Sequence, residues 1–170
     1  IVASLVFLPK FIMMSMHPLK YREIIEKYSS EYGLDAYLIM AIIKVESNYN
    51  KDAVSHKGAK GLMQLTDQTA QWGAQKLGMD DYASDKVYDP ETNIKIGCWY
   101  LNNLMKEFDN NLSLVLAAYN GGSGNVNKWL NDENLSKSGK TLDKIPFKET
   151  EQFIKKVMKE YHIYVKLYKK

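Results

Sequence analysis

The residue with the clearest chemical potential is Glu46, an acid near the end of a predicted apolar helix. The preceding residues 36–45 are almost all apolar. At 100° per residue, Glu46 lies about 20° from Ile39 and about 40° from Ile42 around the helix axis. Burial on this apolar face disfavours the charged carboxylate and raises its pKa above the ordinary value of about 4.3. A carboxylic acid that stays protonated near neutral pH is suited to general acid catalysis.

A second interpretation of Glu46 is structural: its carboxylate reaches water at the helix end, or pairs with Lys44 or Lys51. The segment that follows bears on this choice. Small residues let a loop backbone pass close to a helix end, and polar side chains can orient a ligand there. Taken singly, each of these small or polar residues is also common in turns. The residues in question are Ser47, Asn48, Ser55, Gly58, Ala59, Gly61, Met63 and Gln64.

The elements that would position these residues are predicted to be helices. Helical spacing of apolar residues recurs along the chain, and strand alternation is nearly absent. The sequence therefore predicts a mostly α, single domain of about seven helices with little or no sheet. A loop interrupts the pattern at 48–65. The predicted helices cover residues 21–32, 35–47, 66–77, 89–105 and 112–119, a short segment around 126–130, and a last helix from about residue 149.

Several helix ends carry recognisable start and stop signals. Asp35 is predicted to cap the second helix, because an aspartate side chain accepts hydrogen bonds from the first-turn N–H groups. Asp89-Pro90 combines such a cap with a proline at the first helical position, where its missing N–H costs nothing. Gly33 follows the first helix as a stop. The run from Leu112 to Tyr119 ends at Asn120-Gly121-Gly122.

Composition limits the classes of protein. The chain has 170 residues, of which 45% are hydrophobic, and this length and apolar fraction fit one folded domain and exclude disorder. A single cysteine, Cys98, excludes a disulfide framework. The net charge of +3 is too small to indicate nucleic acid, and six Lys against two Glu in residues 151–170 make the excess local. Such a basic helix is normally a solvated face, and it can also attract an anionic polymer or a lipid surface.

The first sixteen residues form an apolar leader interrupted by Ser4, Pro9, Lys10 and Ser15. No uninterrupted run reaches the roughly 18 residues of a membrane-spanning helix. We interpret residues 1–16 as the remnant of a signal or membrane anchor, with 17–170 as the catalytic domain. The alternative is an ordinary N-terminal segment packed on the domain.

Four blocks of residues along the chain form one ordered pattern. They are Glu46-Ser47, Ala53, Ser55, Gly58-Ala59, Gly61-Leu62-Met63-Gln64 and Thr69-Ala70; then Asp89-Pro90, Asn93-Ile94, Gly97 and Tyr100-Leu101; then Ala118-Tyr119-Asn120-Gly121, Gly124 and Val126; and finally Ile145-Pro146-Phe147, Glu149-Thr150, Val157 and Tyr161. Together these blocks resemble the lytic transglycosylase catalytic domain, the soluble lytic transglycosylase-like branch of the lysozyme-like glycoside hydrolases (family 23). The resemblance covers about residues 18–165. Thr66-Asp67, Gly122-Ser123 and Phe153 depart from the family pattern, and Phe153 replaces a frequent Tyr.

This resemblance implies a lysozyme-like helical fold and a single catalytic acid/base, Glu46. It also implies a set of substrate-binding residues: Ser47, Ser55, Met63, Gln64, Tyr119, Asn120 and Glu149. The implied reaction cleaves the β-1,4 bond between N-acetylmuramic acid and N-acetylglucosamine in peptidoglycan without water and leaves 1,6-anhydro-muramoyl ends. The expected partner is the peptidoglycan glycan strand, with no nucleic acid. We expect the protein to be a monomer and to lie in the cell envelope, outside the cytoplasm.

Two other functions stay open on the sequence. A hydrolytic, goose-lysozyme-like muramidase would need a second carboxylate to position water, and the candidates are Asp52, Asp67, Asp89 and Glu149. A non-catalytic peptidoglycan-binding domain would keep Tyr119 and the cleft but would not need Glu46. No metal site is predicted, because the histidines are widely separated and no His, Cys or acidic cluster has ligand spacing. No cofactor is expected either.

Overall fold

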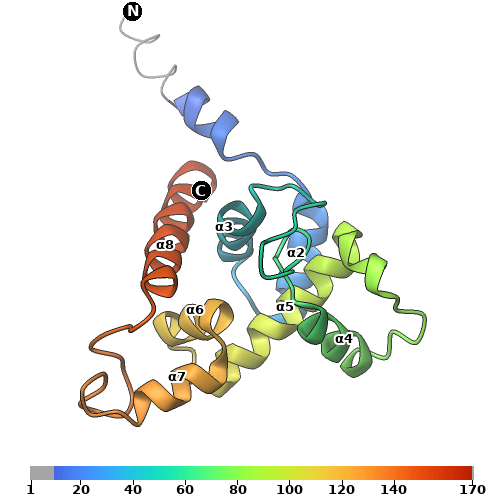
Figure 1. Cartoon of the computed structure of the whole chain (residues 1–170). Coiled ribbons are helices and arrows are strands. Elements are labelled where there is room, and N and C mark those ends of the chain that lie inside the picture. The colour runs from blue at the N-terminus through green and yellow to red at the C-terminus, as the bar shows by residue number, and fades with distance from the viewer. Residues whose placement is uncertain (1–9, 170) are drawn as a thin grey trace, which may run out of the picture.

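The computed structural model describes residues 10–169, which fold into helices packed around a central one, α3 (Figure 1). Within these residues, the only β structure is two isolated bridges, Val54 with Lys60 and Lys60 with Leu65. The prediction of a mostly α fold with little or no sheet is therefore confirmed. The helices are α2 (Arg22–Tyr32), α3 (Ala36–Ser47), α4 (Asp67–Lys76), the 3-10 helix η1 (Ser84–Tyr88), α5 (Pro90–Glu107), α6 (Leu112–Gly121), α7 (Ser123–Leu130) and α8 (Lys148–Tyr168).

The predicted caps are present. Asp35 accepts a hydrogen bond from the Tyr37 N–H at 2.8 Å and so starts α3. Asp89 accepts from the Thr92 N–H at 2.9 Å, directly before Pro90 at the start of α5. Gly33 ends α2 with φ of 65°, the left-handed conformation that glycine adopts without strain. These local signals fix where the two helices around the core begin.

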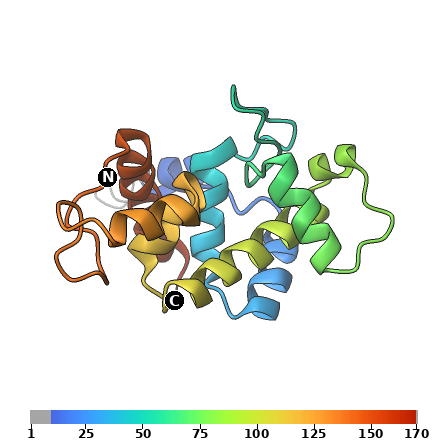
Figure 2. The same ribbon diagram turned by 60° about the horizontal axis from the view of Figure 1, so that its bottom comes forward.

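The core surrounds α3, whose residues 38–43 are all buried. α3 packs mainly against α8, which lies on one side of it, while α2 packs against α5 on the other (Figure 1, Figure 2). At the end of the core nearest the N-terminal segment, the hydroxyls of Tyr49 and Tyr164 lie 2.8 Å apart and share a hydrogen bond. α3 is thus enclosed along its middle, and its last turn, residues 44–47, is partly exposed.

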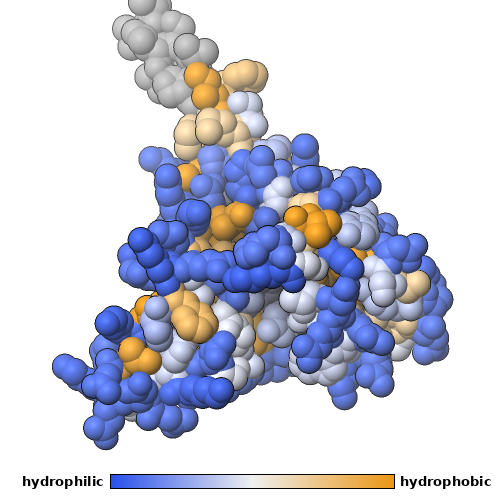
Figure 3. Space-filling model, viewed as in Figure 1, coloured by the Kyte–Doolittle hydropathy of each residue, from blue (hydrophilic) through white to orange (hydrophobic). Residues whose placement is uncertain are grey.

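Two short elements are not predicted from the sequence. The 3-10 helix η1 is too short to show a helical period. Residues 10–16 form a helix that projects from the domain (Figure 1), and Phe11, Ile12, Met14 and Met16 on it are exposed. Figure 3 shows apolar side chains gathered at this end of the described chain. The rest of the predicted leader, residues 1–9, lies outside the described residues. No helix between residues 10 and 169 combines the length and the apolar character needed to cross a bilayer.

Candidate active site

Glu46 lies in the last turn of α3 and is half-buried. Burial, with a smaller contribution from the nearby negative charge of Glu149, raises the pKa of the Glu46 carboxyl to about 8. The lysines that could have neutralised it have other partners, because Lys44 donates to Asn48 and Lys51 pairs with Asp52. Glu46 is therefore mostly protonated at neutral pH and can donate a proton.

The loop after α3 is held in place by Asn93, a fully buried residue of α5. Its side-chain oxygen accepts from the Met63 N–H at 2.8 Å, and its amide nitrogen donates to the Val87 carbonyl at 2.8 Å. Gly61 lets the loop reach this position. It has φ of +77°, and a Cβ there would meet the Asn93 amide and lie 2.8 Å from the Val87 carbonyl oxygen. Asn93 and Gly61 thus fix the loop in front of Glu46.

Met63 is fully buried, so its side chain is part of the core rather than of an open cleft surface. The side chain packs against Gly97 of α5, where a Cβ would lie 2.8 Å from Met63 Cε. Its main-chain carbonyl instead faces α6 and accepts a hydrogen bond from the Tyr119 hydroxyl at 2.8 Å. In this structure Met63 contributes to the site through its backbone.

Tyr119 brings the end of α6 to the loop and to Glu46. Its ring lies between two other rings, tilted against Tyr100 with centroids 5.6 Å apart and stacked on Phe153 at 6.3 Å. Burial raises the pKa of Tyr119 well above its ordinary value, and the nearby Glu46 carboxyl adds to this. Tyr119 is thus a neutral hydrogen-bonding side chain held beside the acid.

The start of α8 borders the site beside the end of α6 and the loop. Glu149 forms an ion pair at 2.7 Å with Lys57 of the loop, and both side chains are more than half exposed. Hydrogen bonding to Lys57 lowers the pKa of Glu149, so this carboxyl is ionised. Thr150 donates a hydrogen bond at 2.8 Å to the side-chain oxygen of Asn120. The structure therefore brings Glu46, Met63, Tyr119, Asn120 and Glu149 to one place.

The three remaining predicted site residues lie in the loop or beside it, and their side chains bind backbone. The Ser47 hydroxyl donates to the Ile43 carbonyl at 3.1 Å. The Ser55 hydroxyl accepts from the Ala59 N–H at 3.0 Å and so closes a turn. The Gln64 amide donates to the carbonyls of Ala53 and Gly61 at 3.2 and 2.9 Å, which leaves its oxygen as an acceptor.

Among the four candidate second carboxylates, only Glu149 affects the pKa of Glu46. Asp52 pairs with Lys51, and Asp67 pairs with Lys60. Asp89 accepts the N-cap hydrogen bond of α5. A mechanism that requires two acids in this structure would therefore use Glu46 and Glu149.

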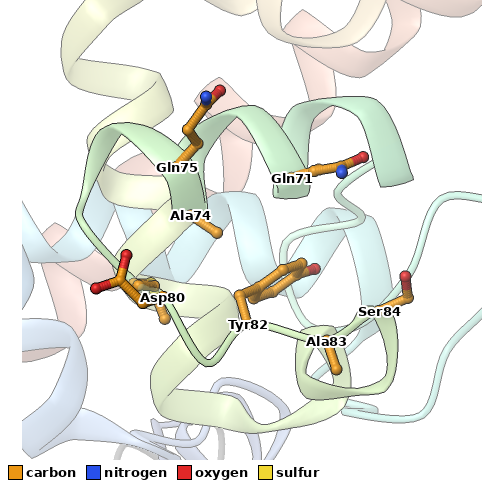
Figure 4. A pocket seen from close by; sticks show the side chains of 8 residues that line it. Gln71, Ala74, Gln75, Asp80, Tyr82, Ala83 and Ser84 are labelled. Atoms are coloured by element: carbon orange, nitrogen blue, oxygen red, sulfur yellow. The ribbon is translucent and has the colours of Figure 1, made fainter.

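Two pockets flank α4. One has a volume of about 470 Å³ and is lined by residues of α4, α5 and the α6–α7 junction, including Trp72, Tyr100 and Ser123. The other, of about 290 Å³, lies between α4 and the segment that leads into η1; Figure 4 shows Gln71, Gln75 and Tyr82 around it. The first pocket shares Tyr100 with the ring cluster of Tyr119 and is the one that borders the site.

Among residues 10–169, no group of three His, Cys, Asp or Glu residues is arranged to hold a metal ion. Cys98 is buried, and burial raises its thiol pKa, so it is a core residue.

Sequence reasoning did not assign roles to Lys57, Asn93 or Trp72. The available signal for Asn93 was its place, with Ile94, among the residues that match the family pattern, whereas the pairing of Lys57 with a residue 92 positions away had none.

Comparison with known proteins agrees with this arrangement. The family model described as the Transglycosylase SLT domain matches residues 23–141. The soluble lytic murein transglycosylase of Escherichia coli K12 is 36% identical over 143 residues, which cover 83% of this chain and 22% of that protein. The chain thus spans about a fifth of the length of this relative.

Two solved structures are similar in fold and sequence. The complex of the 70-kDa soluble lytic transglycosylase with bulgecin A matches 93% of this chain and 26% of its own, with a TM-score of 0.83 and 32% identity. The lytic transglycosylase Slt of Pseudomonas aeruginosa, solved as an inactive mutant with glutamine in place of a glutamate, matches 88% of this chain and 24% of its own. Its TM-score is 0.77, at 32% identity.

Proposed function

Because the chain belongs to the SLT transglycosylase domain family, we propose that it is a peptidoglycan lytic transglycosylase with Glu46 as its acid/base. The observation that carries this proposal is a half-buried Glu46 with a pKa of about 8, beside Tyr119 and Glu149. The inactive glutamate-to-glutamine mutant of the Pseudomonas aeruginosa relative supports an essential glutamate in this family. The substrate is the β-1,4 bond between N-acetylmuramic acid and N-acetylglucosamine.

Glu46 acts first as an acid. At pH 7, a carboxyl with a pKa of about 8 is protonated in about nine of ten molecules. It protonates the leaving oxygen as the glycosidic bond breaks, while the N-acetyl group of the muramic acid stabilises the positive charge that develops at C1. Glu46 then carries a negative charge in a half-buried position next to Glu149. That unfavourable charge favours recovery of a proton in the next step.

Glu46 acts next as a base. It takes the proton from the 6-hydroxyl of the same muramic acid, and that oxygen attacks C1 to close the 1,6-anhydro ring. Because the nucleophile is part of the substrate, its effective concentration is high, up to about 10⁵–10⁸ M in favourable intramolecular reactions. One carboxyl group therefore suffices, whereas most glycosidases use two.

The residues around Glu46 hold the glycan in this scheme. Tyr119 and Asn120 form one wall, and the Met63 backbone with Gln64 forms the loop wall. Gln64 keeps its side-chain oxygen as an acceptor, and Glu149 at the start of α8 contacts substrate next to Asn120. Ser47 and Ser55 support the loop and border the cleft. The chain is expected to act as a monomer without a cofactor.

Glu46→Gln tests the proposal. The variant should lose nearly all cleavage of purified peptidoglycan, while it still binds the glycan in a pull-down with the insoluble polymer. Mass spectrometry of the products of the unmodified chain should show 1,6-anhydro-muramoyl ends. Undiminished cleavage by the glutamine variant would contradict the role of Glu46 and would also revive a purely binding role for the domain.

A hydrolytic, goose-lysozyme-like muramidase is the second candidate function. The position of the Glu149 carboxylate near Glu46 favours it. This carboxylate is ionised and close enough to Glu46 to raise its pKa, so it could position a water molecule. Its ion pair with Lys57 weakens its ability to act as a base. Reducing muramic acid ends in place of anhydro ends would establish hydrolysis and replace the transglycosylase reaction.

We also propose that residues 1–16 attach the catalytic domain, 17–170, to the outer face of a membrane in the cell envelope. Four exposed apolar side chains on residues 10–16 support this, together with the lysines of α8. Sedimentation with phosphatidylglycerol vesicles should retain the protein, and Phe11→Ser with Ile12→Ser should release it. Equal retention of this double variant would contradict attachment through the segment.

A further inference from the structure

Trp72 is an exposed tryptophan whose ring is nevertheless held rigidly. Its residue surface is 43% exposed, whereas Trp99 is only partly exposed and Trp129 is buried. The ring of Trp99 meets that of Trp72 edge-on at a centroid distance of 4.7 Å, and Tyr100 does so at 6.4 Å. Since both contacts orient the ring before any ligand arrives, binding to its open surface would cost little side-chain entropy.

The open surface of Trp72 lines the pocket of about 470 Å³ between α4, α5 and the α6–α7 junction. Polar side chains surround the ring there. The Asn103 amide nitrogen donates to the Trp99 carbonyl at 2.9 Å, so its oxygen is left as an acceptor. An aromatic surface bordered by amide, carboxylate and hydroxyl groups suits a sugar, which has apolar C–H faces and a rim of hydroxyls. The polar side chains are those of Gln68, Thr69, Asn103, Glu107 and Ser123.

Tyr100 lies between the pocket and the active site. Tyr100 lines the pocket, and its ring lies 5.6 Å from that of Tyr119, which stands beside Glu46. The rings of Trp72, Tyr100 and Tyr119 thus form a row that leads from Glu46 to the pocket. We infer that Trp72 is the stacking platform for a distal sugar residue of the same glycan strand, in a subsite apart from the bond cleaved at Glu46.

This inference rests on the proposed function, and it has a consequence for substrate length. A sugar stacked on Trp72 contributes binding energy only when the chain is long enough to occupy both the pocket and the site at Glu46. Strands that extend past the cleaved bond on this side are therefore preferred over short fragments. Trp72 determines specificity for chain length and takes no part in bond cleavage.

The pocket can be altered in two independent ways. Trp72→Ala removes the platform, and Trp72→Tyr keeps an aromatic ring of smaller area. Gly124→Phe leaves Trp72 in place but fills the pocket, because a Cβ at Gly124 meets no atom within 4 Å and its φ needs no glycine. Phe11→Ala is the matched control, since Phe11 is an exposed aromatic residue outside this pocket.

Isothermal titration calorimetry with β-1,4-linked N-acetylglucosamine oligomers of two to six units tests the inference. All variants carry Glu46→Gln as well, so that no oligomer is cleaved. The parent should bind the hexamer more tightly than the trimer. Trp72→Ala and Gly124→Phe should weaken hexamer binding about tenfold, the factor that corresponds to about 1.4 kcal/mol. Trp72→Tyr should recover most of the loss, and Phe11→Ala should bind like the parent.

Each outcome decides the question. Equal hexamer affinity in the parent, Trp72→Ala and Gly124→Phe would overturn the inference, as would a parent whose affinity does not rise with length. A loss in Trp72→Ala with none in Gly124→Phe would place the sugar elsewhere and would overturn it too. Because binding is measured without cleavage, these results are separate from the peptidoglycan assay of Glu46→Gln, on which the proposed function depends.

Discussion

The Tyr119 hydroxyl donates a hydrogen bond to the main-chain carbonyl of Met63 across a distance of 2.8 Å. The two residues are 56 positions apart, and the bond joins the end of α6 to the loop in front of Glu46. It uses the proton of the Tyr119 hydroxyl, so the hydroxyl oxygen is left as an acceptor, while the ring packs against Tyr100 and Phe153. Tyr119 therefore orders the site as well as bordering it.

Tyr119→Phe should lower both stability and activity. The substitution leaves the carbonyl of the buried Met63 without its partner, which costs about 1–3 kcal/mol of unfolding free energy. Urea denaturation measures the loss, and peptidoglycan turnover should fall because the loop is less firmly placed. Tyr100→Phe is the control, since the Tyr100 hydroxyl makes no hydrogen bond within residues 10–169. Equal stability losses in the two variants would refute a special role for the Tyr119 hydroxyl.

Gly61→Ala and Gly58→Ala form a matched pair in the same loop. Both glycines have φ near +80°, at +77° and +79°, so either alanine costs about 1–2 kcal/mol of backbone strain. Only at Gly61 does the added Cβ also meet Asn93, which anchors the loop. Gly61→Ala should therefore lose several-fold more activity and a clearly larger part of the unfolding free energy. Thermal unfolding of both variants decides this, and a similar shift in melting temperature would rule out the close approach.

The sequence predicts the helical frame well because its boundaries are set locally. Asp35, Asp89 and Gly33 act on N–H and C=O groups within their own turns, so their effect can be predicted from neighbouring residues alone. The position of Glu46 on an apolar face follows from helical periodicity in the same way. The raised pKa of Glu46 agrees with that prediction.

Contacts between distant segments could not be predicted from the sequence. Lys57 meets Glu149 only because α8 returns past the loop, and Met63 turns its side chain inward because Gly97 leaves room for it. The same holds for Trp72, whose open ring depends on the packing of α4 against α5. These relationships are set by tertiary packing, which has no local signature in the chain.

Burial of Glu46 mainly sets the alkaline limit of activity, and the Lys57–Glu149 ion pair should shift it. The negative charge of Glu149 raises the pKa of Glu46, and activity requires protonated Glu46. Glu149→Gln removes the repulsion, lowers the pKa of Glu46 and should move the alkaline limb of the kcat profile to lower pH. Lys57→Gln leaves Glu149 uncompensated, so the limb should move to higher pH.

Lys51→Gln is the matched control for this pair, because Lys51 is an exposed lysine of the same loop that pairs with Asp52 instead. Its pH profile should coincide with that of the unmodified chain. Shifts of Glu149→Gln and Lys57→Gln in the same direction would be incompatible with an electrostatic coupling to Glu46.

Glu46→Gln should stabilise the fold while it removes activity, and the gain should grow with pH. The Glu46 carboxyl has a pKa of about 8 in the folded protein against 4.5 for an ordinary Glu. Between these values the folded state holds the proton more tightly than the unfolded state, so stability falls as pH rises. Glutamine does not titrate, so it removes this change of the unfolding free energy with pH, which is at most about 1.4 kcal/mol for each pH unit.

Urea denaturation of Glu46→Gln and of the unmodified chain at pH 5 and pH 8 measures the change. Glu151→Gln is the control: Lys155 lowers the pKa of Glu151, so this carboxyl is ionised in the folded and unfolded states at both pH values, and the stability difference should be nearly the same at pH 5 and pH 8. A constant difference between Glu46→Gln and the unmodified chain at both pH values would mean that Glu46 is not destabilised by its surroundings, and the argument for it as a protonated acid would fail.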